Sequence, residues 1–471
     1  MELRVVQKSR WAGDLFIVPV LAAKTPEPGK PGKEIGDAVL VGKDGRRSLL
    51  ISLGLEDKLK AESFRKVGGA AARWLSKNQV SAAGVDVGEF SSYGIDNSLQ
   101  AFSEGLLLGS FRFVRHKSEN ADSSDTRVEF LVEDTTSEVE DRLHRVETAA
   151  RAVNLAREWA HEPPNVINPI TLAERASELA NRIGLGCRIY DEKQLEEMGA
   201  EAILAVGKGS RTPSRLIVLE YPGKGEEPGS PVLLVGKAIT FDTGGYTIKD
   251  KAGMTGMKYD KCGGVTVVGI LQAAAELGLR TPVVGIIGAA ENMISAESYR
   301  PDDIIKTLSG KTIEIVSADA EGRVVLCDAL TYAQQHYQPR AIIDLATLTG
   351  GVVVALGKIR AGIMSNNQEL VTQLVESGER VHERIWQLPL DEEYFDLIKG
   401  DDSDFKNSGA RDAHAIIGGI FLKQFISEQV PWAHIDIAGV ATTEKDQPYN
   451  PKGATGFGVR LILDYLESLE R

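Results

Sequence analysis

Carboxylates and lysines gather in three short segments of this sequence, and these residues have the types and spacing that best fit catalytic chemistry. The segments cover residues 234–249, 257–264 and 317–323. The candidate side chains are, in chain order, Lys237, Asp242, Lys249, Asp260, Asp319, Glu321 and Arg323. Brought together without compensation, the four carboxylates would repel one another, and one or two divalent cations would relieve that repulsion. A site rich in oxygen ligands suits Mg, Mn or a paired Zn centre.

Each of these carboxylates also has a purely structural interpretation. Asp260 and Asp319 stand just before expected helices, where an aspartate commonly caps the first turn. Asp242 begins an Asp-Thr-Gly-Gly sequence, which is also typical of a plain turn. Taken singly, the structural interpretation is the stronger one for each residue. Taken together, four carboxylates and several lysines at strand ends favour a common site.

Two other motifs give weaker indications of function. Residues 309–312, Ser-Gly-Lys-Thr, resemble the end of a phosphate-binding loop, but Ile305 replaces the required glycine and the flanks predict a turn between strands. None of the seven histidines belongs to an HExxH motif, and two prolines follow His161-Glu162 and prevent a continuing helix. The sequence therefore argues against a zincin-type site, and a catalytic metal would be held mainly by oxygen ligands.

Strand-like and helix-like segments alternate along the chain after residue 165, and they must position these side chains. Strands are expected at 231–235, 282–289, 313–316, 341–345 and 434–438, and helices at 170–183, 264–276, 321–336, 367–377, 414–426 and 458–469. This pattern predicts an α/β fold whose mostly parallel central sheet is covered by helices on both faces. Such sheets bind ligands at the carboxyl ends of their strands, which is where the carboxylates fall.

The residues before this region predict a second, smaller α/β unit. Strands are expected at 16–23, 38–41, 48–53, 84–87 and 128–132, and helices at 56–76 and 96–108. A long charged helix is expected over 137–161, stopped by Pro163 and Pro164. We therefore expect an N-terminal domain over 1–136, a connecting helix over 137–165 and a catalytic domain over 166–471.

The overall charge is acidic, with 54 Lys and Arg against 67 Asp and Glu and a formal net charge of −13. This balance does not support binding to nucleic acid or to anionic membranes. Three cysteines cannot build a disulfide framework, which predicts a reducing compartment. The uncharged runs 262–275 and 345–357 are too short to span a bilayer, and the first residues show no signal peptide. The sequence predicts a soluble, cytoplasmic protein.

The three segments resemble the leucine aminopeptidase (cytosol aminopeptidase) family of two-metal exopeptidases. Residues 317–323, Ser-Ala-Asp-Ala-Glu-Gly-Arg, resemble the family signature NTDAEGR. Residues 235–249 match its VGKGITFDSGG…K pattern, and residues 257–264 match its MKxDMGGA pattern. Further matches follow in order at 346–350, 404–409, 432–439 and 452–458. The similarity is clear over roughly residues 150–471 and faint before them.

By this resemblance, five side chains would be metal ligands: Lys237, Asp242, Asp260, Asp319 and Glu321. Asp242 and Glu321 would bridge two divalent ions, Zn or Mn, with Mg or Co as alternatives. Lys237 and Asp260 would complete the tighter site, and Asp319 the more exchangeable one. A lysine binds metal only as the neutral amine, and adjacent dications favour that form by depressing its pKa.

The resemblance also implies a mechanism. Two cations would bridge a water and hold it as hydroxide, and one would bind the free α-amino group of the peptide. Lys249 and Arg323 would be catalytic, with Lys249 stabilising the oxyanion and Arg323 holding a bicarbonate that shuttles the proton. Positions that match the pocket for the first substrate side chain are Met257, Thr347, Gly350, Ala438 and Ala441.

The sequence departs from the family pattern at a few positions. Thr243 replaces the usual Ser, Ser317-Ala318 replaces Asn-Thr, and Lys261 replaces Met. None of these changes removes a ligand, but Lys261 adds a cation beside Asp260. The family further implies a macro-like N-terminal domain and a homo-hexamer built from two trimers. The alternative is a catalytically silent homologue with a binding or structural role.

Overall fold

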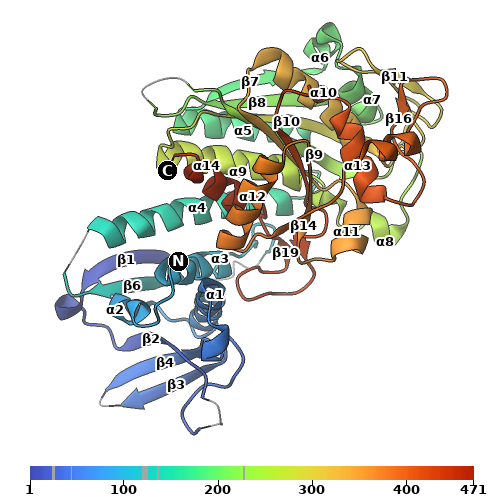
Figure 1. Cartoon of the computed structure of the whole chain (residues 1–471). Coiled ribbons are helices and arrows are strands. Elements are labelled where there is room, and N and C mark those ends of the chain that lie inside the picture. The colour runs from blue at the N-terminus through green and yellow to red at the C-terminus, as the bar shows by residue number, and fades with distance from the viewer. Residues whose placement is uncertain (24–26, 44, 119–125, 135–136, 226–228, 471) are drawn as a thin grey trace. The chain divides into compact units, whose positions relative to one another are not determined.

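The computed structural model describes residues 1–23, 27–43, 45–118, 126–134, 137–225 and 229–470. The chain divides into two compact units. The first comprises Met1–Asn154 with Thr443–Gly453, and the second comprises Leu155–Thr442 with Ala454–Arg471. In Figure 1 the strands within residues 2–132 are blue to teal, and those within residues 186–454 run from green to red.

The first unit contains a six-stranded sheet in the order β1-β6-β5-β2-β4-β3. In that order the strands are Glu2–Gln7, Arg127–Val132, Ala82–Asp86, Leu15–Val20, Arg46–Ser52 and Ala38–Lys43. Every neighbouring pair is parallel except β3 and β4. The helices are α1 (Ala61–Lys77), α2 (Val87–Ser91) and α3 (Ser98–Gly109). A Cβ added at Gly68 or Gly105 would lie about 2 Å from a backbone oxygen of the other helix, so α1 and α3 pack backbone to backbone.

Helix α4 (Ser137–His161) begins and ends where the sequence predicts. The division between the two units falls within this helix, between Asn154 and Leu155. Its last seven residues, about two turns, therefore belong to the second unit, together with the Pro163-Pro164 segment that follows it.

The second unit is built on an eight-stranded sheet in the order β15-β14-β17-β13-β9-β10-β8-β7. In that order the strands are Ile385–Gln387, Ala361–Ser365, Trp432–Asp436, Ala341–Ala346, Val232–Asp242, Val283–Asn292, Arg215–Tyr221 and Gly186–Tyr190. The four central strands, β17, β13, β9 and β10, are mutually parallel, whereas β14, β8 and β7 pair antiparallel with an inner neighbour. The sheet is thus mixed at its edges and parallel at its centre.

Helices cover both faces of this central sheet. Gly285 and Gly288 lie three residues apart on β10 and so point to opposite faces. A Cβ added at Gly285 would meet Val267 of α9 (Cys262–Leu277), and one added at Gly288 would meet Val325 of α10 (Glu321–His336). The other helices are α5 (Pro169–Ile183), α6 (Glu192–Met198), α7 (Glu201–Gly207), α8 (Lys251–Met254), α11 (Gly350–Leu356), α12 (Gln368–Val381), α13 (His414–Lys423) and α14 (Val459–Ser468). The predicted two-domain α/β architecture with a mostly parallel sheet is confirmed.

The Ser309–Thr312 motif lies in a hairpin turn. Strand β11 (Ile304–Lys306) pairs antiparallel with β12 (Thr312–Glu314), and β12 pairs parallel with the short β16 (Phe405–Lys406). Gly310 has φ +86°, the left-handed conformation that this turn requires. The prediction of a turn in place of a phosphate loop is therefore confirmed. A further two-stranded pair is formed by β18 (Thr442–Thr443) and β19 (Gly453–Ala454).

Two further features of the fold concern the cysteines and the apolar helices. All three cysteines are free thiols; Cys262 and Cys327 are buried and Cys187 is partly exposed. Among the described residues, no helix combines the length and apolar character needed to cross a membrane.

Asp328 on α10 anchors the start of α7, and its loss should destabilise the second unit. Its carboxylate accepts hydrogen bonds from the backbone N–H groups of Ala202, Ile203 and Leu308 at 2.8–3.1 Å. Asp328→Ala leaves two buried N–H donors and a partly buried one without this acceptor, so we expect the free energy of unfolding to fall by about 3 kcal/mol. Urea denaturation measures this loss. The exposed control Asp396→Ala should change stability by less than about 0.5 kcal/mol, and equal stabilities of the two variants would contradict the prediction.

Candidate metal centre

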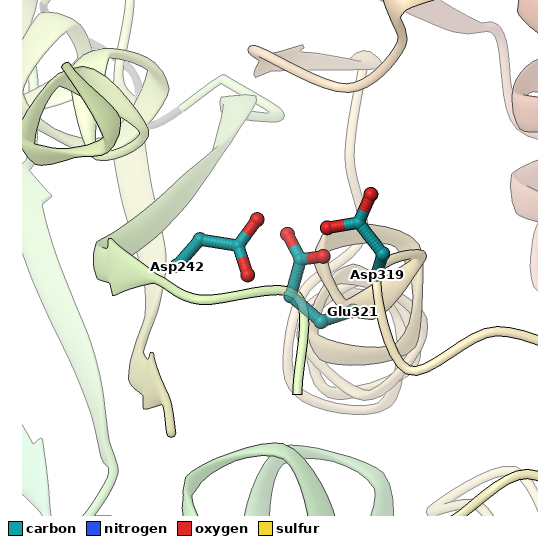
Figure 2. A group of neighbouring side chains, drawn as sticks. All are labelled: Asp242, Asp319 and Glu321. Carbon is teal, nitrogen blue, oxygen red and sulfur yellow. The ribbon is translucent and has the colours of Figure 1, made fainter. Parts of the chain in front are cut away.

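The structure brings three of the predicted carboxylates together. Asp242 is the last residue of β9, whereas Asp319 and Glu321 stand at the start of α10. Each offers a carboxylate oxygen, and these three oxygens lie within 4.8 Å of one another. Figure 2 shows the carboxylate of Asp242 facing those of Asp319 and Glu321, which come from a second segment at the start of α10. Of these three, only Asp242 lies at the end of a strand of the central sheet, because the strand expected at 313–316 is β12 of the separate three-stranded sheet. The prediction that all the carboxylates follow central strands is therefore wrong for Asp319 and Glu321, which reach the carboxyl end of β9 through α10, a helix packed on that central sheet.

Asp260 joins this cluster through Lys237. The Lys237 Nζ atom lies 2.9 Å from Asp260 Oδ2 and 2.8 Å from Glu321 Oε1. Asp260 Oδ1 also accepts a hydrogen bond of 2.7 Å from the Thr347 hydroxyl, and the Thr347 carbonyl accepts one of 2.9 Å from Lys237 Nζ. Thr347 follows β13, so β9, β13, the start of α9 and the start of α10 all contribute to this network.

Lys249 contacts the opposite part of the cluster. Its Nζ atom lies 2.8 Å from Asp242 Oδ2 and forms a second ion pair with Asp319. The two lysines therefore neutralise much of the charge of the carboxylates with which they share the site. All five predicted ligands and Lys249 belong to one connected network of ion pairs and short oxygen contacts.

Burial perturbs the protonation of these groups. Burial raises the pKa of Asp260 to about 8, against the opposing effect of Lys237. Burial also raises the pKa of Asp242 and of Asp319. For Lys237 and Lys249, burial alone would lower the pKa, but the surrounding carboxylates outweigh it and raise the pKa. The buried carboxylates of this site therefore favour bound positive charge, whether from protons, lysines or metal ions.

The free oxygen atoms of the cluster fit a divalent cation. Glu321 Oε2 is buried and accepts no hydrogen bond from any of the described residues. Asp260 Oδ2 and Asp319 Oδ1 are buried as well, and both face lysine ammonium groups. Buried carboxylate oxygens without hydrogen-bond donors are costly unless a cation compensates them. The donor set of carboxylate oxygens and one amine suits Mn or a paired Zn centre.

Arg323 lies two residues after Glu321, in the first turn of α10. Its side chain is buried, and Nη1 donates a hydrogen bond of 3.0 Å to the Asn407 carbonyl. Burial lowers the pKa of Arg323 to about 10, so the guanidinium remains charged at neutral pH. Its Nε atom is buried without a hydrogen-bond acceptor among the described residues. A buried, charged donor of this kind fits a small anion.

Comparison with known proteins assigns the family. The profile of the catalytic domain of the cytosol aminopeptidase family matches residues 154–463, and that of its N-terminal domain matches residues 29–120. The chain belongs to the cytosol aminopeptidase family. The predicted family and the predicted class of enzyme, a peptidase of the hydrolase type, are both confirmed.

Relatives of this aminopeptidase cover most of the chain. A probable cytosol aminopeptidase from Geobacter sp. (strain M21) is 44% identical over 428 residues, covering 89% of this chain and 85% of the relative. A probable cytosol aminopeptidase from Aquifex aeolicus (strain VF5) is 42% identical, and the match covers 88% of this chain and 84% of the relative. Among solved structures, the bottromycin maturation enzyme BotP in complex with Mn gives a TM-score of 0.89 at 30% identity. The match covers 98% of this chain and 100% of the BotP chain. A mutant tomato leucine aminopeptidase gives a TM-score of 0.88 at 32% identity, and the match covers 99% of this chain and 96% of the tomato chain.

The structure places the predicted pocket residues of this aminopeptidase in different surroundings. Thr347 belongs to the network itself. Gly350 lines a cavity of about 660 Å³ that is bounded by α11, the start of α13 and the loop before it. Ala441 is buried and lines a packed space together with Cys262. The backbone N–H of Ala438 donates to Asp436, and Met257 is partly buried at the start of the short 3-10 turn η3 (Met257–Tyr259).

The sequence analysis missed residues that orient the predicted ligands. Asn292 at the end of β10 donates through Nδ2 to Asp242 Oδ1 at 2.8 Å and to the Ala318 carbonyl at 3.0 Å. The buried Tyr299 hydroxyl donates to the same carbonyl at 2.7 Å. Asn407 accepts backbone hydrogen bonds from residues 316 and 317 and contacts Arg323. The one available signal is the position of Asn292 at the carboxyl end of a central strand.

Asn292→Ala should weaken metal binding without unfolding the protein. The change removes the donor that orients Asp242 and ties it to the segment bearing Asp319, and partners of metal ligands typically contribute about 10- to 100-fold to affinity. Titration of the metal-depleted protein with Mn²⁺ measures the effect. Asn366→Ala provides the control, because its side chain bonds to residues 430 and 432 at the surface. Equal affinities in both variants would contradict the assignment.

Proposed function

We propose that this chain is a metal-dependent aminopeptidase that removes the N-terminal residue, leucine and others, from peptides. Five side chains would hold two divalent ions: Lys237, Asp242, Asp260, Asp319 and Glu321. The observation that carries this proposal is the buried carboxylate cluster, in which Glu321 Oε2 accepts no hydrogen bond from the described part of the chain. The ions would be Zn or Mn, with Mg or Co as alternatives, and the Mn complex of BotP supports Mn.

The bound ions would supply Lewis acidity, a water of lowered pKa and an anchor for the free α-amino group. Lys237 would take part as the neutral amine, so it must give up its proton when the site is loaded. Lys249 keeps its charge beside Asp242 and Asp319, where an ammonium group stabilises the negative charge that develops on the substrate carbonyl oxygen. Its tether to two predicted ligands holds it close to the reacting atoms.

Arg323 would hold a bicarbonate that moves the proton from the attacking water to the leaving amine. The buried Nε atom, which has no acceptor among the described residues, supports this role. The backbone contact of Nη1 with Asn407 fixes the orientation of the guanidinium. Once the carboxylates are used as ligands, an external anion is the remaining candidate for the base.

The remaining assignments extend the proposal beyond the metal centre. Met257, Thr347, Gly350, Ala438 and Ala441 would line the pocket for the first substrate side chain. The domains would span 1–136, 137–165 and 166–471, with the first of them macro-like. The protein would act in the cytoplasm as a homo-hexamer of two trimers. Its formal net charge of −13 gives no support for nucleic-acid binding.

Hydrolysis of leucine p-nitroanilide tests the proposed activity. We expect turnover that chelation abolishes and that added Mn²⁺ restores. N-acetyl-leucine p-nitroanilide is the matched control, since a blocked amine removes the anchor for the substrate, and it should not be cleaved. Turnover that is unchanged by the chelator would overturn the proposed metal dependence. An absence of turnover with every metal would favour a catalytically silent homologue.

A further inference from the structure

Lys261 is a fully buried lysine beside a proposed metal ligand. Its exposed fraction is 0%. The Nζ atom donates to three main-chain carbonyls: Glu162 at 2.9 Å, Ala160 at 3.2 Å, and Lys258 at a shorter distance. A buried ammonium group is costly unless its three donors are satisfied, and here three carbonyl oxygens satisfy them.

A proline explains why one of these carbonyls, that of Ala160, needs a donor from outside the helix. Within a continuing helix, the Ala160 carbonyl would accept from the backbone nitrogen of residue 164, but Pro164 has no N–H. Pro163 likewise has no N–H to donate to the Trp159 carbonyl, so the helical hydrogen bonding of α4 stops here. Lys261 supplies the missing donor for Ala160, and it also binds the carbonyl of Glu162 just past the helix.

Lys258 reinforces the same connection from the other end of the turn. Its Nζ atom donates to the His161 carbonyl at 2.8 Å. Two lysines, one on each side of Tyr259-Asp260, therefore attach this short turn to the end of α4. On its other side the turn leads directly into α9, because the Lys261 carbonyl accepts a hydrogen bond from Val265. Asp260 is thus held on a segment that is fixed at both ends.

We propose that Lys261 is a positioning residue that fixes the carboxylate of Asp260 for metal binding by bonding its turn to the carbonyl end of α4. This inference rests on the proposed function. The family pattern carries Met at this position, and methionine has no hydrogen-bond donor, so this contact departs from that pattern. Asp260 in turn contacts Lys237 and Thr347, and a shift of its turn would disturb both contacts.

A purely electrostatic role for Lys261 would have the opposite consequence. A cation beside Asp260 would repel a divalent ion, and its removal would then strengthen metal binding. The position of Nζ argues against this view, since it is surrounded by three carbonyl dipoles that offset its charge. The positioning role predicts weaker binding after removal, so the two roles differ in sign.

Calorimetric titration of the metal-depleted protein with Mn²⁺ separates these roles. In K261M we expect one of two sites to bind about 10- to 100-fold more weakly, with the other site unchanged. K261Q, which keeps a shorter donor, should lie between K261M and the wild type. Lys306→Met changes an exposed lysine on β11 and should match the wild type. Circular dichroism establishes that each variant is folded, and K261Q carries the comparison if K261M does not fold.

The outcomes of the titration distinguish failure of the positioning role of Lys261 from failure of the proposed function. Unchanged or tighter binding in the folded variant, with two sites in the wild type, would overturn the positioning role alone. A wild-type protein that binds no Mn²⁺ would overturn the proposed function, and the inference would fall with it. Selective weakening of one site would support both.

Discussion

Replacing Glu321 by glutamine is expected to reduce kcat/KM by about a thousandfold, or roughly 4 kcal/mol, and to remove bound metal. Glu321 lies at the centre of the cluster, because its carboxylate contacts Lys237 and lies within 4.8 Å of Asp242 and Asp319 oxygens. Glutamine keeps the shape but removes the charge that would bridge two cations. Hydrolysis of leucine p-nitroanilide and metal analysis of the same sample measure the two effects together.

The control for this variant is Glu297→Ala, an exposed glutamate in the same unit. It should keep full activity and full metal content. Circular dichroism should show that Glu321→Gln is folded, since the change relieves repulsion among buried carboxylates. Activity within a few-fold of the wild type in Glu321→Gln would show that this carboxylate is not a ligand.

Lys249→Met is expected to lower kcat by about 100- to 1,000-fold while both metal ions remain bound. The side chain is not a proposed ligand, and in the proposed mechanism its ammonium group would contribute positive charge where the substrate oxygen becomes negative. Removing the ammonium also removes a competitor for Asp242 and Asp319, so metal binding should be unchanged or tighter. Steady-state kinetics and metal analysis distinguish this outcome from that of Glu321→Gln.

Loss of metal from Lys249→Met, in parallel with the loss of activity, would contradict the catalytic role. The lysine would then act by organising the carboxylates. An effect confined to KM would contradict it as well, because an interaction made only in the transition state lowers kcat.

The sequence predicts the central fold well because its strands are apolar and its helices carry clear boundaries. Strand β9 is the informative exception, since apolar patterning predicts an end at Val235 and the strand continues to Asp242. Pairing with β10 extends it through Lys237, whereas β13 pairs with it only as far as Gly236. A strand core tolerates the charge of Lys237 only with partners such as Asp260 and Glu321. A charged residue inside a buried strand was therefore itself a sign of the site.

The elements that the sequence analysis does not anticipate lie mainly at the margins. Strands β1, β7, β8 and β14 are edge strands or neighbours of an edge, and β1 and β7 mix charged with apolar residues so that period-two patterning is weak. Short helices such as α7 depend on tertiary partners, as the contact of its first turn with Asp328 shows. Local sequence carries no record of a partner more than 120 residues away.

The candidate site, like the fold, is only partly predictable from local sequence. A single residue such as Asp242 fits either a turn or a metal ligand, and the resemblance to a family indicates which residues form one site, whereas their spacing alone does not. The orienting residues Asn292, Tyr299 and Asn407 escaped because their roles depend on hydrogen bonds between distant segments. The sequence marks Lys261 as a departure, whereas its bonds to the end of α4 become visible only in three dimensions.

Anomalous X-ray diffraction from crystals soaked in Mn²⁺ tests the central claim most directly. The account predicts two anomalous peaks per chain, both in contact with Glu321 and Asp242, with Lys237 and Asp260 beside one and Asp319 beside the other. Peaks located elsewhere, or an absence of peaks among these five side chains at saturating Mn²⁺, would contradict it.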